Sequence, residues 1–187
     1  MNETLAVINK RYSCRAYTDQ TVPDESLRAA AEAGAAAPSA NNSQRWSIAV
    51  VSDKKLVDEL EAEGLRTIAA MPDKTLHERI QSRGVGLFYN APAIVVVSTD
   101  QAGGDGALLD CGIVVENITI AAASLGIASC ICGLAGLAFS DDQKAAYFKE
   151  KLKFPDGYRF GMAILLGYEK APGTPHAIDP SKIAYIR

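Results

Sequence analysis

Two short stretches decide the interpretation of this chain: Arg11-Tyr12-Ser13-Cys14-Arg15 and, further along, Ala37-Pro38-Ser39-Ala40-Asn41-Asn42-Ser43-Gln44-Arg45-Trp46. The first places two guanidinium groups and a hydroxyl within five residues. Arginine stays charged and offers a planar fork of donors, and serine adds a short hydroxyl donor. This combination suits a phosphate or another anionic ligand. Taken alone, however, the segment is more simply a solvated turn.

The second stretch is rich in small residues that form hydrogen bonds. Asn42 and Gln44 offer amides and Ser39 a hydroxyl, which could line the edge of a planar ligand. A surface loop between a helix and a strand explains the same residues when they are considered alone. Gly133-Leu134-Ala135-Gly136 is a third, weaker candidate, because glycine lets backbone approach a ligand closely.

Hydrophobic periodicity and capping signals predict an irregular order of helices and strands rather than a βαβ alternation. The expected helices cover 3–9, 25–36, 53–64, part of 71–86, 106–125 with Gly126 after its end, and a helix to 152 opened by a capping box at 140–143. The expected strands cover 46–52, 91–97, 127–131 and 160–168, with a tight loop at 133–136. This order favours an α+β fold with a mixed or antiparallel sheet flanked by helices. Residues 1–187 contain no repeat or linker, so we expect a single domain.

The expected helix at 106–125 is apolar on most of its circumference, with Asp110, Glu116 and Asn117 as exceptions. Such a helix needs cover on every side, so we expect it to be central or in a subunit interface.

The composition excludes several classes of protein. A net charge of -3 gives no reason to expect nucleic acid as a partner. The apolar region 111–136 is interrupted by polar residues, and 1–3 lack the features of a secretory signal, so we expect no membrane association and a cytoplasmic location.

The cysteines and histidines do not form a metal-binding pattern. Cys130 and Cys132 are the only close pair, and no second pair or nearby histidine completes a zinc site. We therefore predict no metal and buried thiols; a redox dithiol or a metal-binding role for these cysteines is the alternative. Hydrolase and P-loop motifs are also missing, so an organic cofactor would have to supply any reactivity.

The chain as a whole resembles the nitroreductase family of FMN-dependent NAD(P)H oxidoreductases. The two opening stretches carry the resemblance, together with Phe88-Tyr89-Asn90-Ala91-Pro92, the run from 110 through Cys130, and Leu166-Gly167-Tyr168. The family implies a layered nitroreductase fold and an intertwined homodimer whose two FMN sites are each built from both subunits.

The resemblance also implies site residues. It assigns FMN binding to Arg11, Tyr12, Ser13 and Arg15 of one subunit, to Pro38, Ser39, Ala40 and Asn42 of the other, and to Ile131, Cys132, Gly133 and Leu134 near the flavin ring. It assigns substrate contacts to Asn41 and Phe88, and no catalytic side chain, because the flavin carries the chemistry.

The chain departs from the family pattern at two places. Many members carry a basic phosphate clamp where this chain has Pro175-His176-Ala177-Ile178. The family's Asn and Lys at the flavin pyrimidine are replaced here by Gly84-Val85-Gly86-Leu87. These departures leave more of the phosphate charge to Arg11, with His176 as a weak helper, and the pyrimidine edge to Arg15.

The expected function is hydride transfer from NADH or NADPH through FMN to an electron-poor acceptor such as a nitroaromatic or a quinone. A small planar acceptor is thus the expected partner besides the second subunit. The alternative is a flavin-binding, flavin-storing or sensor module of the same fold with little turnover, which the weakened phosphate clamp motivates.

Overall fold

Four strands form the centre of the protein in the computed structural model, which describes residues 2–187. They are β1 (Trp46–Val51), β2 (Ala93–Asp100), β3 (Ala128–Ile131) and β4 (Tyr158–Gly167). Their order in the sheet is β1-β2-β4-β3, and each neighbouring pair is antiparallel. The α+β prediction is confirmed, and of the two sheet types expected the antiparallel one is found.

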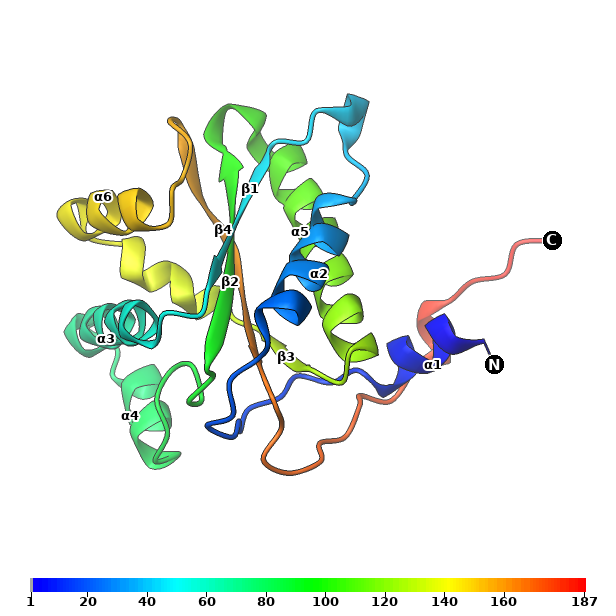
Figure 1. Cartoon of the computed structure of the whole chain (residues 1–187), viewed down its shortest axis with the longest axis horizontal. Helices are drawn as coiled ribbons and strands as arrows, with labels where there is room; N and C mark the ends of the chain where they lie inside the picture. The colour runs from blue at the N-terminus through cyan, green and yellow to red at the C-terminus, as the bar shows by residue number, and fades with distance from the viewer. Residues whose placement is uncertain (1) are drawn as a thin grey trace.

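Helices cover both faces of this sheet (Figure 1). They are α1 (Glu3–Lys10), α2 (Asp24–Ala35), α3 (Lys54–Ala70), α4 (Thr75–Ser82), α5 (Gly104–Ser124) and α6 (Asp142–Lys151). Helices α2 and α5 lie on one face, and α3, α4 and α6 on the other. The alternating side chains of β2 explain this arrangement: Ile94 and Val96 enter one core, and Val95 and Val97 the other.

The apolar helix α5 is central, as its sequence predicts. It packs on the sheet and on α2, where Gly34 allows close approach: an added Cβ would lie 2.5 Å from Ile118 Cγ1. Gly126 follows the helix with φ +73°, the left-handed conformation expected after a helix end. The outer face of α5, however, carries exposed apolar side chains, above all Leu109, which is 72% exposed.

Length and composition alone would also allow one stretch within residues 2–187, Gln101–Ser124, to cross a membrane. This stretch contains α5, and 44% of its most apolar part is buried inside the protein. Its packing against the sheet and α2 makes it the core helix of this fold.

Three predicted boundaries are wrong. Helix α3 does not end at Gly64 but continues to Ala70. The glycine serves close packing rather than termination, because an added Cβ would lie 2.9 Å from Leu87 Cδ2. Helix α6 is capped by Asp141, which accepts from the Lys144 amide at 3.0 Å, and not by Ser140. The expected loop at 133–136 belongs to a 3₁₀ helix, Gly133–Phe139.

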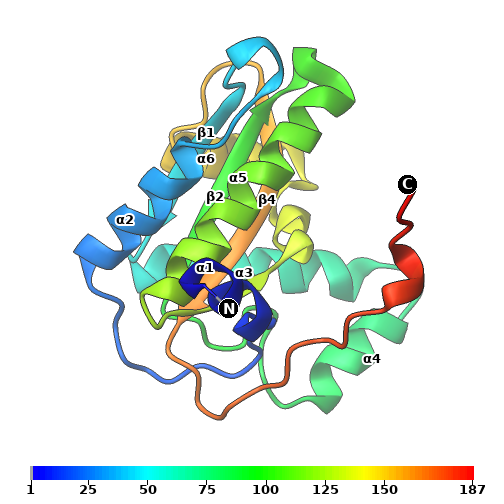
Figure 2. The same cartoon turned by 90° about the vertical axis from the view of Figure 1, so that its right-hand side faces the viewer.

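Beyond the sheet, residues 171–187 form a tail that leaves the body of the molecule (Figure 2). The tail contains one short 3₁₀ turn, Pro180–Lys182. Its large apolar side chains are exposed: Ile178, Ile183, Tyr185 and Ile186. A chain segment with this much uncovered apolar surface suits packing against another molecule.

Candidate functional site

The first motif lies alongside strand β3. Ser13 forms a parallel bridge with Ser129, and the Cys14 amide donates to the Ser129 carbonyl at 2.9 Å. Because side chains alternate along extended backbone, Cys14 enters the core while Arg15 stays exposed. The sheet thereby fixes the backbone that carries Ser13 and both arginines.

Arg11 is the more enclosed of the two arginines, with its side chain 18% exposed. Its Nε lies 3.9 Å from Glu116 Oε1 on α5, and the Thr119 hydroxyl donates to the other Glu116 oxygen at 3.0 Å. The polar exception Glu116 therefore holds the guanidinium of Arg11 at the outer surface of α5.

Tyr12 fastens the first motif to the chain after β4. Its hydroxyl donates to Glu169 Oε2, and its ring packs so closely on Gly173 that an added Cβ there would collide with it. The Lys170 amide also donates to the Ala16 carbonyl at 2.9 Å. Tyr12 thus positions the segment through its side chain.

A cavity of about 270 Å³ lies beside the first motif, at the C-terminal end of α5. Lys10, Arg11 and Tyr12 line it together with Ser129 and Glu169. Ser129 Oγ is buried and, within residues 2–187, has no hydrogen-bond partner. This hydroxyl is an unsatisfied buried donor beside a cavity that also carries the charged side chains of Lys10, Arg11 and Glu169.

The second motif folds into a compact loop that includes the 3₁₀ turn Ala40–Asn42. The Gln44 amide donates to Ser39 Oγ at 2.9 Å, and Gln44 Nε2 donates to Asn42 Oδ1 at 2.8 Å. Asn41, Asn42 and Gln44 all have positive φ, between 46° and 53°. Pro38, Ala40, Asn41 and Asn42 are exposed, so the loop presents its polar groups outward.

The loop is tied to the body of the protein by a buried carboxylate. Asp110 of α5 is 6% exposed, and its Oδ1 accepts from the Ala40 amide at 3.3 Å. Nearby, Asn117 Nδ2 donates to the Ala33 carbonyl at 3.0 Å. Each polar exception on α5 therefore makes one tertiary contact: Asp110 with the Ala40 amide, Asn117 with the Ala33 carbonyl, and Glu116 with Arg11. The sequence signalled these residues only as interruptions of an apolar pattern.

A single chain does not bring the two motifs together. The second motif lines a cavity at the N-terminal end of α5 with Gly106 and Asp110, and the first lines one at the C-terminal end with Ala123 and Ser124. Figure 1 shows the loop between α2 and β1 and the segment after α1 at opposite ends of α5. A ligand held by both motifs would need them from two copies of the chain.

The third segment extends from the end of β3. Ile131, Gly133 and Leu134 are exposed, whereas Cys132 is buried and its amide donates to the Ala163 carbonyl at 2.8 Å. Because the bridge at Ser13 and Ser129 is parallel, Arg15 runs beside Ile131. Burial raises the pKa of the Cys130 thiol, an effect that the nearby Arg15 partly opposes.

The prediction that Phe88 contacts substrate does not fit its position. The side chain is 1% exposed and packed in the core between the sheet and α3. Its amide donates to the Glu61 carboxylate, which fixes the loop before β2. Phe88 is large and apolar because the core needs it, and it presents no surface to a ligand in this conformation.

All four cysteines are buried and free, as predicted. Burial raises the pKa of Cys132 to about 11 and that of Cys111 to about 11, so these thiols stay protonated at neutral pH and are poor nucleophiles. Within residues 2–187, groups of three or more histidine, cysteine and acidic side chains suited to a metal ion are not found.

Comparison with known proteins identifies the family. The family model described as "Nitroreductase family" matches residues 8–168, so the chain belongs to the nitroreductase family. A relative in Archaeoglobus fulgidus is 29% identical over 174 residues, which cover 91% of this chain and 87% of the relative. That relative carries the provisional name NADH dehydrogenase/NAD(P)H nitroreductase.

Solved structures agree with this assignment. The fold is similar to that of a nitroreductase with bound FMN from Desulfitobacterium hafniense DCB-2, with a TM-score of 0.97, 47% identity and full coverage of both chains. A nitroreductase with bound FMN from Bacteroides fragilis NCTC 9343 matches with a TM-score of 0.90 and 32% identity, again over both full chains. The layered nitroreductase fold expected from the sequence is confirmed.

Proposed function

We propose that this protein is a homodimeric FMN-dependent NAD(P)H oxidoreductase. The observation that carries the proposal is the first motif, whose Arg11, Ser13 and Arg15 are fixed beside β3 in a fold that matches FMN-bound nitroreductases. When bound, FMN supplies hydride transfer at N5, from NADH or NADPH in one half-reaction to an electron-poor acceptor such as a nitroaromatic or quinone in the next.

The residues of the chain suit this cofactor. Two cations and the unpartnered Ser129 hydroxyl lie along the first motif and its cavity, where an anionic phosphate needs donors. Arg11 binds the phosphate, because its guanidinium is partly enclosed, and Ser13 adds a hydroxyl donor. Arg15, exposed beside Ile131, places positive charge near the flavin pyrimidine edge. Ile131, Gly133 and Leu134 offer an apolar surface to the ring.

The second subunit completes the site. The loop with Pro38, Ser39, Ala40 and Asn42 lies at the far end of α5 from Arg11, so it contacts the flavin of the partner, and Asn41 faces the substrate there. The exposed apolar face of α5 around Leu109 supplies the dimer contact, which covers surface that a monomer leaves in water.

The test is direct. The purified protein should release FMN on denaturation and oxidise NADH or NADPH with a nitroaromatic or quinone acceptor. Arg11→Ala should weaken FMN binding by about 2–4 kcal/mol, because a charged partner of the phosphate is lost. Arg28→Ala, which removes an exposed arginine on α2, is the matched control. Equal FMN affinity in Arg11→Ala and the control would contradict the assignment of Arg11.

A further inference from the structure

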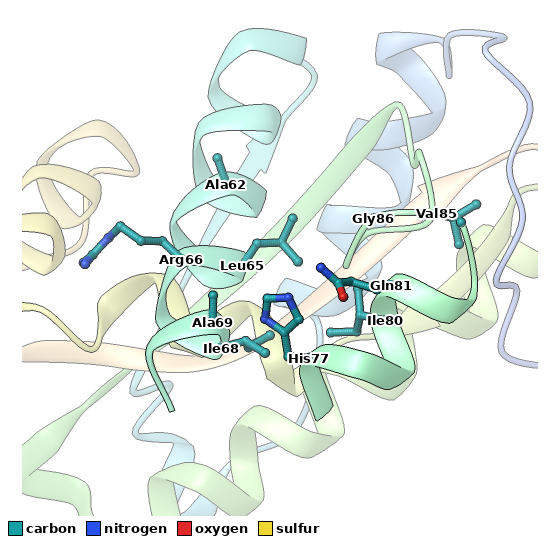
Figure 3. A pocket seen from close by; sticks show the side chains of 11 residues that line it. Ala62, Leu65, Arg66, Ile68, Ala69, His77, Ile80, Gln81, Val85 and Gly86 are labelled. Carbon is teal, nitrogen blue, oxygen red and sulfur yellow. The ribbon is translucent and has the colours of Figure 1, made fainter. Parts of the chain in front are cut away.

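We count the cavity of about 480 Å³ between α3 and α4 with the proposed flavin site (Figure 3). Its wall includes residues 84–86, which stand where family members carry their contacts to the flavin pyrimidine. His77 and Gln81 of α4 open into the same space. A larger cavity, of about 660 Å³, shares no lining residue with it, and its lining includes none of the residues assigned to flavin or substrate.

Four segments of the chain meet around this larger cavity, which we call the Lys170 cavity. The lining comes from within 17–21, from 52–54 at the end of β1 and the start of α3, from 90–92 before β2, and from Lys170 after β4. Concave sites with a few converging polar groups are the usual form of small-molecule sites.

The floor of the Lys170 cavity is apolar and fixed. Tyr17 forms an antiparallel bridge with Glu169, so the backbone beneath the cavity is paired. The rings of Tyr17 and Pro92 pack on Gly167, where an added Cβ would lie 2.8 Å from Tyr17 Cδ1 and 2.7 Å from Pro92 Cδ. A floor held by these contacts needs little ordering on binding, which lowers the entropic cost of association.

Asn90 lines the cavity from a strained turn. Asn90 has φ +62° and the preceding Tyr89 has φ +54°, a left-handed conformation that residues other than glycine adopt infrequently. Arg83 holds this turn, because its Nη1 donates to the Tyr89 hydroxyl at 2.8 Å and its guanidinium lies 5.7 Å from the ring centroid. Backbone strain that surrounding contacts maintain is concentrated at functional sites, including those that clamp ligands.

Two side chains of opposite charge line the Lys170 cavity without a partner. Asp19 comes from the segment after Tyr17, and Lys170 from the chain after β4. Within residues 2–187 neither charged group has an ion-pair or hydrogen-bond partner. The third charged residue of the lining, Lys54, is paired with Asp58 one turn along α3. The cavity therefore offers one free carboxylate and one free ammonium group, and this favours a ligand that carries both charges.

Neutral donors complete the lining. They are the hydroxyls of Thr18, Thr21 and Ser52 and the side-chain amide of Asn90. Each can donate a hydrogen bond to a carboxylate oxygen.

We infer that the Lys170 cavity binds a free α-amino acid with an apolar side chain. Lys170 and the neutral donors bind its carboxylate, and Asp19 binds its ammonium group. The apolar side chain packs on Tyr17 and Pro92. This binding goes beyond the proposed function and does not require the flavin.

Leucine is the probe, used in isothermal titration calorimetry with the purified full chain. Leucine should bind saturably. Leucinamide lacks the carboxylate and N-acetyl-leucine lacks the ammonium group, and each should bind roughly tenfold more weakly, because one charged partner in the cavity is left unpaired. Glycine should also bind more weakly than leucine, since it has no apolar side chain to bury.

Two variants connect each charge of the ligand to one residue. Asp19→Asn should lose the preference for leucine over N-acetyl-leucine but keep the preference over leucinamide. Lys170→Met should lose the preference over leucinamide but keep that over N-acetyl-leucine. Asp156→Asn and Lys144→Met remove exposed charges outside the cavity and should bind all the probes as the wild type does.

The outcome decides the inference in either direction. Selective loss of one preference in each variant would support it. Failure of leucine to bind saturably to the wild type would overturn it. Variants at Asp19 and Lys170 that keep both preferences of the wild type would overturn it as well.

Discussion

Asp110→Ala tests the proposal that one chain shapes the flavin site of its partner. Asp110 is buried on α5, and its carboxylate accepts from the Ala40 amide at 3.3 Å. The loop that it holds contains three residues with positive φ, of which Asn41 and Asn42 each have 53°. Such conformations carry backbone strain and persist only where the surrounding structure holds them. Asp110 supplies such support.

The magnitude follows from the geometry. A hydrogen bond to a charged group contributes about 1.5–3 kcal/mol, and the long distance here places this bond at the low end, about 1.5 kcal/mol. If loss of this hydrogen bond destabilises the FMN-binding form of the loop by about 1.5 kcal/mol, FMN affinity falls roughly tenfold. Asp110→Asn keeps an acceptor oxygen of the same shape and should retain most of the affinity. Helix α5 keeps its apolar contacts in both variants, so the protein should stay folded.

The assay is titration of apoprotein with FMN, followed by flavin fluorescence, with urea unfolding as a check on the fold. A mixed dimer then shows which subunit's Asp110 supports a given flavin site. Combining Arg11→Ala and Asp110→Ala chains places both defects in one site and restores the other, so half of the sites should bind with wild-type affinity. If Asp110 acted within its own subunit's flavin site, no mixed site would be intact. Failure to restore any tight site would refute the reasoning.

Two further predictions concern the exposed helix face and the buried thiols. Leu109→Glu should give a monomer that has lost FMN in analytical ultracentrifugation, because a charge replaces apolar contact area on α5. The control, Lys149→Glu on α6, should remain dimeric. A Leu109→Glu dimer with full FMN would contradict this interface. Burial raises the pKa of Cys132 from 9.0 to about 11, so the unfolded chain loses this proton first as pH rises. The contribution of Cys132 to the free energy of unfolding should therefore be fully present below pH 9. It should be lost between pH 9 and 11, with a fall of about 2 kcal/mol at pH 11. Urea unfolding under reducing conditions measures this decrease in the free energy of unfolding. The decrease should be smaller in Cys132→Ser, and an equal decrease in that variant would exclude Cys132 as its source.

The local pattern of the sequence determined the elements of the fold. The β-branched run at 94–97 and the apolar helix before Gly126 form where predicted, because periodicity and propensity act over a few neighbouring residues. Gly64 shows the limit of this reasoning. Local rules allow it to end a helix, but the close approach of Leu87, distant in sequence, is what requires a glycine there.

The same division holds for the candidate site. The sequence by itself marked the two guanidinium groups and the hydroxyl of the first motif as candidate donors for an anionic ligand, because the chemistry of these groups does not depend on the fold. Only the tertiary structure decided that Phe88 is core, that Tyr12 binds Glu169, and that His77 and Gln81 open into a cavity. Burial and contact depend on which segments meet across the sheet. Pairings between segments distant in the chain leave no local pattern in the sequence, so the structure alone determines them.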